Sequence, residues 1–185
     1  ANNTLIIDTT TPSSPISLTT TSTTTNNTTP TITGSAEANS TVKLYSGSTL
    51  LGSATADSNG AFSITSSTLS DGSYSLTATS TDAAGNVSSA SSALSITIDA
   101  TSPSAPSSLT TTSRTTSVTT PVITGSAEAG STVEVFSSST SLGTTTADGN
   151  GAFSFTPSSA LSAGSHSITA TATDAAGNLS SASST

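Results

Sequence analysis

The acidic side chains are the residues of this sequence whose types and spacing could do chemistry. The chain has 185 residues, and its Asp and Glu residues number only ten. Eight of them form four pairs whose members stand 91 or 92 positions apart: Asp8 with Asp99, Glu37 with Glu128, Asp57 with Asp148, and Asp82 with Asp174. Clustered carboxylates repel one another unless a cation neutralises them. Ca²⁺ is a suitable cation, because it takes about six to eight oxygen ligands in flexible loops.

The basic residues are too few to neutralise these acids. Lys and Arg total two, Lys43 and Arg114, and the formal net charge is −8. This balance suits a cationic partner such as a metal ion. It excludes a nucleic-acid groove, because two cationic side chains cannot neutralise a run of phosphates. The sequence also holds no run of about 18 apolar residues, so we expect no membrane insertion.

The acidic pairs belong to an internal repeat that covers most of the chain. Three stretches show it most clearly: IDTTTPSSP at 7–15 returns as IDATSPSAP at 98–106, GSAEANSTV at 34–42 as GSAEAGSTV at 125–133, and TDAAGN at 81–86 as TDAAGN at 173–178. A repeat of this length predicts two tandem domains. We assign residues 8–98 to the first unit and 99–185, with an incomplete last strand, to the second. Residues 1–7 match the end of the last strand of a preceding repeat.

Each unit has the residue pattern of short β-strands. Ser and Thr make up 86 of the 185 residues, and 31% of the residues are apolar. The apolar residues alternate with polar ones, as Val42 and Leu44 do in STVKLYS and Phe62 and Ile64 do in GAFSIT. Period two predicts strands, and Gly-rich and Asn-rich stretches separate them. About seven strands in about 90 residues predict an all-β chain of two tandem Ig-like β-sandwiches.

The predicted topology brings the paired acids together at one pole of each sandwich. Glu37 lies in the loop after the second strand, Asp57 in the turn after the fourth, and Asp82 in the loop after the sixth. Asp8 lies in the segment that leads into the unit. We therefore predict a calcium site from these four residues, and a second one where unit 2 meets unit 1. The second set is Asp99, Glu128, Asp174 and, more weakly, Asp148.

A turn-forming role is the alternative for each Asp. Asp side chains often accept hydrogen bonds from backbone N–H groups two residues on, and so hold tight turns. For Asp57 and Asp148 the turn role is favoured, because each opens an Asp-x-Asn-Gly turn. For Asp99, Glu128 and Asp174 we favour calcium.

Few residues of this sequence could act in catalysis. The chain has no Cys, which excludes disulfides, thiolate metal sites and a Cys nucleophile. His166 is the single histidine, and it stands at the repeat position of Tyr74. Many Ig-like folds carry a corner tyrosine there, so we expect a structural role for His166. The sequence predicts no enzyme.

The repeated stretches GSAEAxSTV, ADxNGAFS and TDAAGN, joined by IDxTxPxxP, resemble the bacterial Ig-like repeats of large surface adhesins and biofilm-associated proteins. The resemblance covers nearly the whole chain. It implies an extracellular, multi-repeat stalk attached to the bacterial surface, with calcium at the junctions between repeats. A junction ion and the prolines that follow each linker aspartate would stiffen such an array.

A filament subunit is the alternative function. Residues 3–8, NTLIID, match residues 94–99, LSITID. Residues 1–7 could therefore complete the open sandwich of another copy by strand addition. The expected partners are neighbouring identical repeats, in the same chain or in a filament, and the sequence names no host receptor. A ligand-binding tip is disfavoured, because aromatic residues make up only 3% of the chain.

Overall fold

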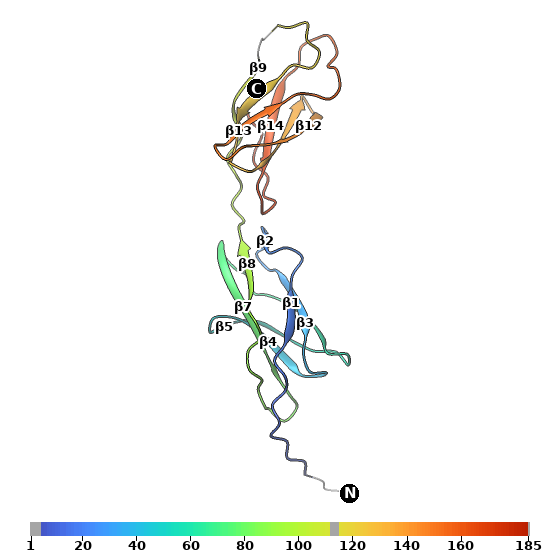
Figure 1. The fold of residues 1–185 in the computed structure, drawn as a ribbon, viewed down its shortest axis with the longest axis vertical. Helices are drawn as coiled ribbons and strands as arrows, with labels where there is room; N and C mark the ends of the chain where they lie inside the picture. The colour runs from blue at the N-terminus through green and yellow to red at the C-terminus, as the bar shows by residue number, and fades with distance from the viewer. Residues whose placement is uncertain (1–4, 112–114, 185) are drawn as a thin grey trace. The chain divides into compact units, whose positions relative to one another are not determined.

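A computed structural model describes residues 5–111 and 115–184. It divides into two compact units, Ala1–Asp99 and Ala100–Thr185. The described residues form strands, turns and loops without any helix, so they contain no helix that could cross a membrane (Figure 1). The prediction of an all-β chain with two Ig-like sandwiches is confirmed.

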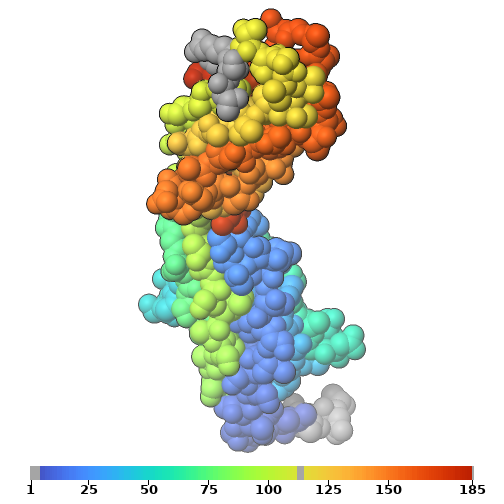
Figure 2. Space-filling model, turned by 45° about the horizontal axis from the view of Figure 1, so that its top comes forward, coloured from blue at the N-terminus to red at the C-terminus, as the bar shows by residue number. Residues whose placement is uncertain are grey.

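Unit 1 is a sandwich of two sheets. The three-stranded sheet has the order β1-β3-β6, with β1 at Ile16–Thr19, β3 at Thr31–Ser35 and β6 at Ala61–Thr65. The five-stranded sheet has the order β2-β8-β7-β4-β5, with β2 at Thr24–Thr25, β8 at Leu94–Ile98, β7 at Gly72–Thr81, β4 at Thr41–Ser46 and β5 at Thr49–Thr55. The neighbours pair antiparallel, except that β2 runs parallel to β8. In Figure 2 the blue chain around β2 and the yellow-green chain around β8 lie side by side on unit 1.

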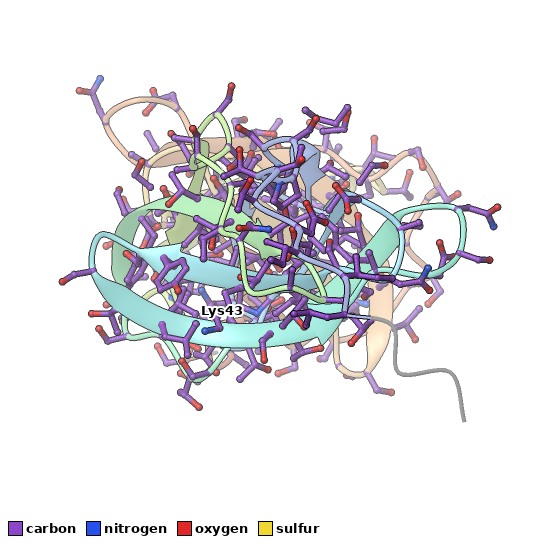
Figure 3. All side chains as sticks on the ribbon, turned by 90° about the horizontal axis from the view of Figure 1, so that it is seen from below. Lys43 is labelled. Atoms are coloured by element: carbon purple, nitrogen blue, oxygen red, sulfur yellow. The ribbon has the colours of Figure 1, made fainter. Side chains whose placement is uncertain are left out.

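The core of unit 1 lies between the two sheets and follows from the period of two. In β4, Val42 and Leu44 are completely buried, whereas Lys43 between them is exposed (Figure 3). Phe62 on β6 packs over Gly34 on β3, because a Cβ at Gly34 would lie only 2.7 Å from the Phe62 ring. Burial of the alternate apolar side chains stabilises both sheets.

Unit 2 repeats this plan with fewer strands. One three-stranded sheet has the order β13-β10-β9, with β9 at Ser107–Thr111, β10 at Ile123–Ser126 and β13 at Ala152–Phe155. The other has the order β12-β11-β14, with β11 at Thr132–Ser137, β12 at Thr140–Thr146 and β14 at Ile168–Thr173. About seven strands were expected in each unit. The described residues form eight strands in unit 1 and six in unit 2, where neither β2 nor β8 has a counterpart.

Candidate functional site

The acid-bearing segments of unit 1 share one end of the five-stranded sheet. Thr41, the first residue of β4, is the register partner of Thr55 at the end of β5 and of Thr81 at the end of β7. Glu37 comes just before β4, Asp57 follows β5 and Asp82 follows β7. The loops that carry Glu37 and Asp57 are joined directly, since Ala36 N–H donates to the Gly60 carbonyl at 2.8 Å.

Unit 2 places its copies in the same way. Thr132, the first residue of β11, is the register partner of Thr146 and of Thr173, the last residues of β12 and β14. Glu128, Asp148 and Asp174 therefore lie at one end of the β12-β11-β14 sheet. Ala127 N–H donates to the Gly151 carbonyl at 2.8 Å, as its counterpart does in unit 1.

Asp82 is the centre of the turn TDAAGN in unit 1. Its Oδ1 accepts hydrogen bonds from the backbone N–H groups of Ala84 and Asn86, both at 2.9 Å. Its Oδ2 accepts another from Nδ2 of Asn86 at 2.8 Å. Gly85 has a φ of +94°, a conformation that glycine adopts without steric cost. The identities of Asp82, Gly85 and Asn86 in the repeated hexapeptide are thus explained by one closed turn.

The turn around Asp174 in unit 2 has the same hydrogen bonds. Oδ1 accepts from Ala176 N–H at 2.8 Å and from Asn178 N–H at 2.9 Å, and Oδ2 accepts from Nδ2 of Asn178 at 2.8 Å. The two aspartates were predicted as site residues from the sequence, whereas Asn86 and Asn178 were not. The available signal was an Asn four residues after each Asp, in both copies.

These hydrogen bonds favour the ionised form of both aspartates. The side-chain amide of Asn86 lowers the pKa of Asp82 below its ordinary value; partial desolvation opposes it, and the N–H groups of the turn lower the pKa further. For Asp174, burial raises the pKa, but the hydrogen bonds from Asn178, Ala176 and Gly177 outweigh it, and the net shift is downward.

Asp57 and Asp148 hold the tight turns of the two units. Oδ1 of Asp57 accepts from Asn59 N–H at 2.8 Å and from Ala61 N–H at 2.9 Å. Asp148 accepts from the equivalent N–H groups of Asn150 and Ala152, at 2.8 and 2.9 Å. Both aspartates therefore form turns, which is the interpretation that their Asp-x-Asn-Gly setting favours.

The two glutamates are fixed through their backbone. The Glu37 carbonyl accepts from Ser40 N–H at 3.1 Å and from Ser40 Oγ at 2.7 Å, and Glu128 and Ser131 repeat both contacts. These bonds position the loop through the backbone and do not involve the carboxylates.

Asp8 and Asp99 occupy equivalent positions in the repeat but lie at different ends of unit 1. Asp8 Oδ1 accepts from Thr10 N–H at 2.9 Å, and the Asp8 carbonyl accepts from Nδ2 of Asn86 at 3.2 Å. This contact ties the N-terminal segment to the TDAAGN turn. Asp99 follows β8, whose last residue is paired with Gly72 at the start of β7, and Asp99 N–H donates to the Thr25 carbonyl at 3.0 Å.

The arrangement of the acidic side chains decides whether they could hold calcium within one unit. Within residues 5–111 and 115–184, no three acidic or histidine side chains form a group that could hold a metal ion. Both oxygens of Asp82 and of Asp174 already accept N–H donors, which compete with a cation for the same lone pairs. The acids of each unit therefore fit turn formation better than an ion site within the unit. Calcium ligation by Asp8, Glu37, Asp82, Asp99, Glu128 and Asp174 stays a prediction.

His166 and Tyr74 make the same corner contact in the two units. The Tyr74 hydroxyl donates to the Ser70 carbonyl at 2.9 Å. Nε2 of His166 lies 2.9 Å from the Ser162 carbonyl, which also stands four residues earlier, and Nδ1 lies 2.8 Å from Ser137 Oγ. Since a carbonyl can only accept, Nε2 carries the proton and donates to it. The expected structural role of His166 is confirmed by this geometry.

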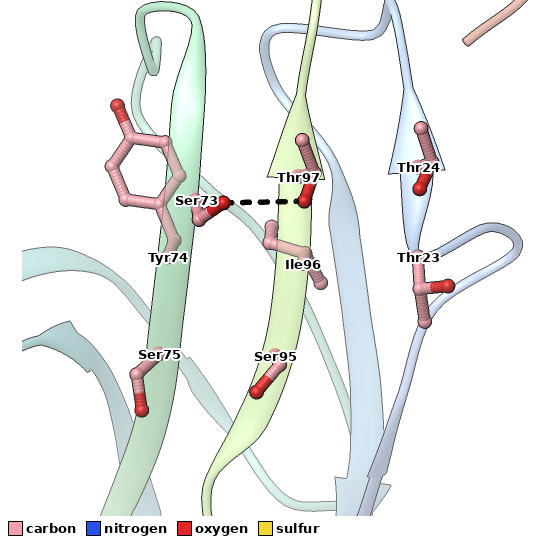
Figure 4. A pocket seen from close by; sticks show the side chains of 8 residues that line it. All are labelled: Thr23, Thr24, Ser73, Tyr74, Ser75, Ser95, Ile96 and Thr97. Carbon is pink, nitrogen blue, oxygen red and sulfur yellow. Dashed lines mark hydrogen bonds between the residues drawn. The ribbon is translucent and has the colours of Figure 1, made fainter. Parts of the chain in front are cut away.

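A shallow hollow lies along β2, β8 and β7 of unit 1 (Figure 4). It is lined by hydroxyl side chains, by the Tyr74 ring and by Ile96, and a hydrogen bond of 3.4 Å joins Ser73 Oγ and Thr97 Oγ1 across two strands. No charged group lines it. The hollow therefore offers neither an acid nor a base for chemistry.

Comparison with known proteins identifies the repeats. The family model described as "Bacterial Ig-like domain" matches the chain twice, over residues 7–100 and 102–185. No curated protein sequence matches the chain.

Three solved structures are similar to the chain. The chain is 17% identical to the fibronectin(III)-like modules of Clostridium thermocellum CbhA, with a TM-score of 0.52 and coverage of 90% of each chain. It is 25% identical to the BSP domain of a biofilm-associated protein, with a TM-score of 0.35, over 85% of this chain and 27% of that one. It is 18% identical to the D0-D1 domain of intimin, with a TM-score of 0.33, over 91% and 96% of the two chains. The chain spans about a quarter of the biofilm-associated structure, and the CbhA likeness shows the fold alone.

Proposed function

The chain belongs to the bacterial Ig-like domain family, and on that premise we propose that its two units are spacer repeats of a surface-attached or secreted bacterial adhesin. Such repeats have an extracellular location and no catalytic role. Their partners are the neighbouring repeats of the same chain, without nucleic acid and without membrane insertion.

One observation carries the proposal. The two units repeat the same hydrogen-bonded turns, down to the three hydrogen bonds that close each TDAAGN turn. A module that recognises a ligand needs a loop of its own, whereas a spacer needs only a stable unit that can be repeated. The hydroxyl-lined hollow of unit 1, which no charged side chain lines, supports the same choice.

A replacement experiment tests the spacer role. The 185-residue segment is placed between a surface anchor and a binding domain of known ligand, on a bacterial surface. Deleting it should weaken capture of the ligand, and an unrelated pair of Ig-like domains of the same length should restore capture. If the unrelated pair fails, while the native segment succeeds, the segment itself has a binding role and the proposal is wrong.

We also propose that calcium binds at the junctions between the repeats. It is supported by the recurrence of the acids at equivalent positions and by the family that the repeats resemble. The residues concerned are Asp99, Glu128 and Asp174 at one junction, and Asp8, Glu37 and Asp82 at the other. A stiffer array in calcium would keep an adhesive end away from the cell surface.

A filament subunit is the second candidate function. It is favoured by the exposed apolar side chains of the N-terminal segment: Leu5, Ile6 and Ile7 are 84%, 81% and 80% exposed. Three adjacent exposed apolar residues of this size favour a partner. Removing residues 1–7 tests this candidate, because a filament would fail to assemble and a spacer would stay a folded monomer.

A further inference from the structure

We propose that two sheet faces of this chain bind to each other between copies, with Lys43 of one copy facing Glu134 of another. The Lys face is the side of β4, β5 and β7 that points away from the core of unit 1. The Glu face is the corresponding side of β11, β12 and β14 in unit 2. The proposal goes beyond the spacer role, because a spacer needs no contact with other copies.

The strands exclude charged residues at every position except one. Among the strand residues within 5–111 and 115–184, only Lys43 on β4 and Glu134 on β11 are charged. They stand 91 positions apart, so they occupy the same place in the two units and carry opposite charges. β4 lies between β5 and β7, and β11 lies between β12 and β14. The two charges are therefore central on equivalent faces.

Both charged side chains point away from the core. Val42 and Leu44, the neighbours of Lys43 in β4, are completely buried, and so are both neighbours of Glu134 in β11. Successive side chains of a strand point to opposite faces of the sheet. Lys43 and Glu134 therefore lie on the outer faces, where another molecule can reach them.

Neither charge has a counter-charge directly opposite it on a neighbouring strand. All four cross-strand neighbours carry hydroxyl groups: Ser53 and Thr79 beside Lys43, and Thr144 and Thr171 beside Glu134. The Glu134 carboxylate is positioned by Ser141, whose Oγ donates to Oε1 at 2.6 Å. This bond uses one carboxylate oxygen, so the other can accept from the ammonium group of a second copy.

An aromatic side chain accompanies each charge on its face. Tyr45 follows Lys43 by two positions, and Phe136 follows Glu134 by two, so both side chains share the outer side with the charge. Both are half-buried, and neither belongs to the core cluster of its unit. Leu50, the cross-strand partner of Tyr45, is 51% exposed. Aromatic residues are enriched in protein interfaces, so these side chains add apolar contact area around the ion pair.

The opposite signs determine which faces can meet. Two Lys faces, or two Glu faces, would bring like charges together and repel, whereas a Lys face attracts a Glu face. Each copy carries one face of each kind, so two copies can form two such contacts with each other. A face of three short strands is smaller than a standard interface, so each contact is weak and transient. Several contacts between copies held close together reinforce one another.

Charge exchange tests this pairing by sedimentation equilibrium in low salt and excess chelator. Lys43→Glu gives a chain with two Glu faces, and Glu134→Lys gives a chain with two Lys faces. Each should associate at least about fivefold more weakly than the native chain, and the double variant should recover to within about twofold. The two single changes move the net charge in opposite directions, so a general charge effect cannot weaken both. A native chain without association, or a double variant without recovery, would overturn the proposal.

Mixing the two single variants tests whether the partner is a second copy. Only in the mixture can a Lys face of one chain meet a Glu face of another, so we expect association to return there. If the mixture associates no better than each variant alone, the faces do not bind each other and the proposal is wrong.

A cross-link locates the contact, because Lys43 is the only Lys of the chain. A carbodiimide couples an ammonium group directly to a carboxylate that touches it. Isotope-labelled and unlabelled chains are mixed, coupled and digested, and mass spectrometry should find Lys43 of one chain joined to Glu134 of the other. Lys43→Arg is the matched control, because it keeps the charge without the reactive amine; it should associate without the cross-link. Coupling confined to one chain, or mainly to other acids, would overturn the proposal.

The contact is separable from both candidate functions. It does not use residues 1–7, so a chain that lacks them should associate as strongly as the native chain. Association that disappears with residues 1–7 would assign the contact to the N-terminal segment and overturn the proposal. A failed charge exchange would leave the spacer role unaffected, because that role does not depend on association between copies.

Discussion

Asn86 binds Asp82 twice, with its backbone N–H donating to Oδ1 at 2.9 Å and its side-chain amide donating to Oδ2 at 2.8 Å. The same amide nitrogen reaches the Asp8 carbonyl at 3.2 Å. The pair therefore closes a loop and also holds the N-terminal segment against it. This double role gives a physical reason for the recurrence of an Asp and an Asn four residues apart in a chain that has few charges.

Replacing Asp82 should destabilise unit 1. Asp82→Ala removes the acceptor of three hydrogen bonds and leaves the N–H groups of Ala84 and Asn86 without it. We expect a lower urea midpoint for unit 1, measured by chemical denaturation. Glu37→Gln is the matched control, because Glu37 lies at the same end and its loop is held by its carbonyl rather than by its carboxylate. Equal midpoints for the two variants would contradict the turn role of Asp82.

Acid should weaken both units through the two TDAAGN turns. The pKa values of Asp82 and Asp174 are lower in the folded chain than in the unfolded one, so the folded state binds fewer protons. The stabilisation is complete above the ordinary Asp pKa of about 3.9, and it is lost as the pH falls below that value through the lowered folded-state pKa. Urea midpoints measured from about pH 6 down to about pH 2.5 should fall more steeply in the native chain than in the Asp82→Asn, Asp174→Asn double variant. Parallel curves would contradict the prediction.

The corner contact should contribute a measurable amount to unit 1. Tyr74→Phe removes the hydroxyl that donates to the Ser70 carbonyl and keeps the ring that packs against the core. We expect a loss of about 1 kcal/mol in the free energy of unfolding, the usual net value of one such hydrogen bond. Tyr45→Phe is the control on β4. A loss no larger than that of the control would show that the corner bond contributes nothing.

Calcium is tested by thermal unfolding in millimolar calcium and in excess chelator. The junction proposal predicts a higher midpoint in calcium, because a ligand that binds only the folded state stabilises it. The rise should disappear in Glu128→Gln, which removes a proposed ligand and keeps the carbonyl contacts to Ser131. Superimposable curves for the native chain would mean that the repeated acids act only as turn formers.

The strands were predictable where one residue faces the core and the next faces water. Val42, Leu44, Phe62 and Ile64 all lie in the predicted alternation, and each is at least nine-tenths buried. The common location of the acidic loops also follows from the order of the strands. β4 begins at the end of the sheet where its antiparallel neighbours β5 and β7 finish. These features depend on residues that are close together in the sequence, so they can be predicted from one sequence without an alignment.

Other features depend on a neighbouring strand and were not predictable. β2 consists only of Thr24 and Thr25, which have no apolar alternation and are in a strand because β8 lies beside them. His166 and Tyr74 occupy nearly identical stretches, yet only Tyr74 lies within a strand. The amide partners of the aspartates were missed for a different reason: Asn in a turn is so common that its side-chain contact cannot be inferred from its presence.

The strongest contrast between the units should appear in amide hydrogen exchange. In unit 1 the residues Ser73 to Ser75 are paired with β8, so their amides should exchange slowly. The copies at 165–167 lie outside any strand, and in dilute chain they should exchange faster by about two orders of magnitude, the change expected if an opening of roughly 3 kcal/mol is no longer needed. Equally slow exchange at 165–167 and at 73–75 would contradict the prediction.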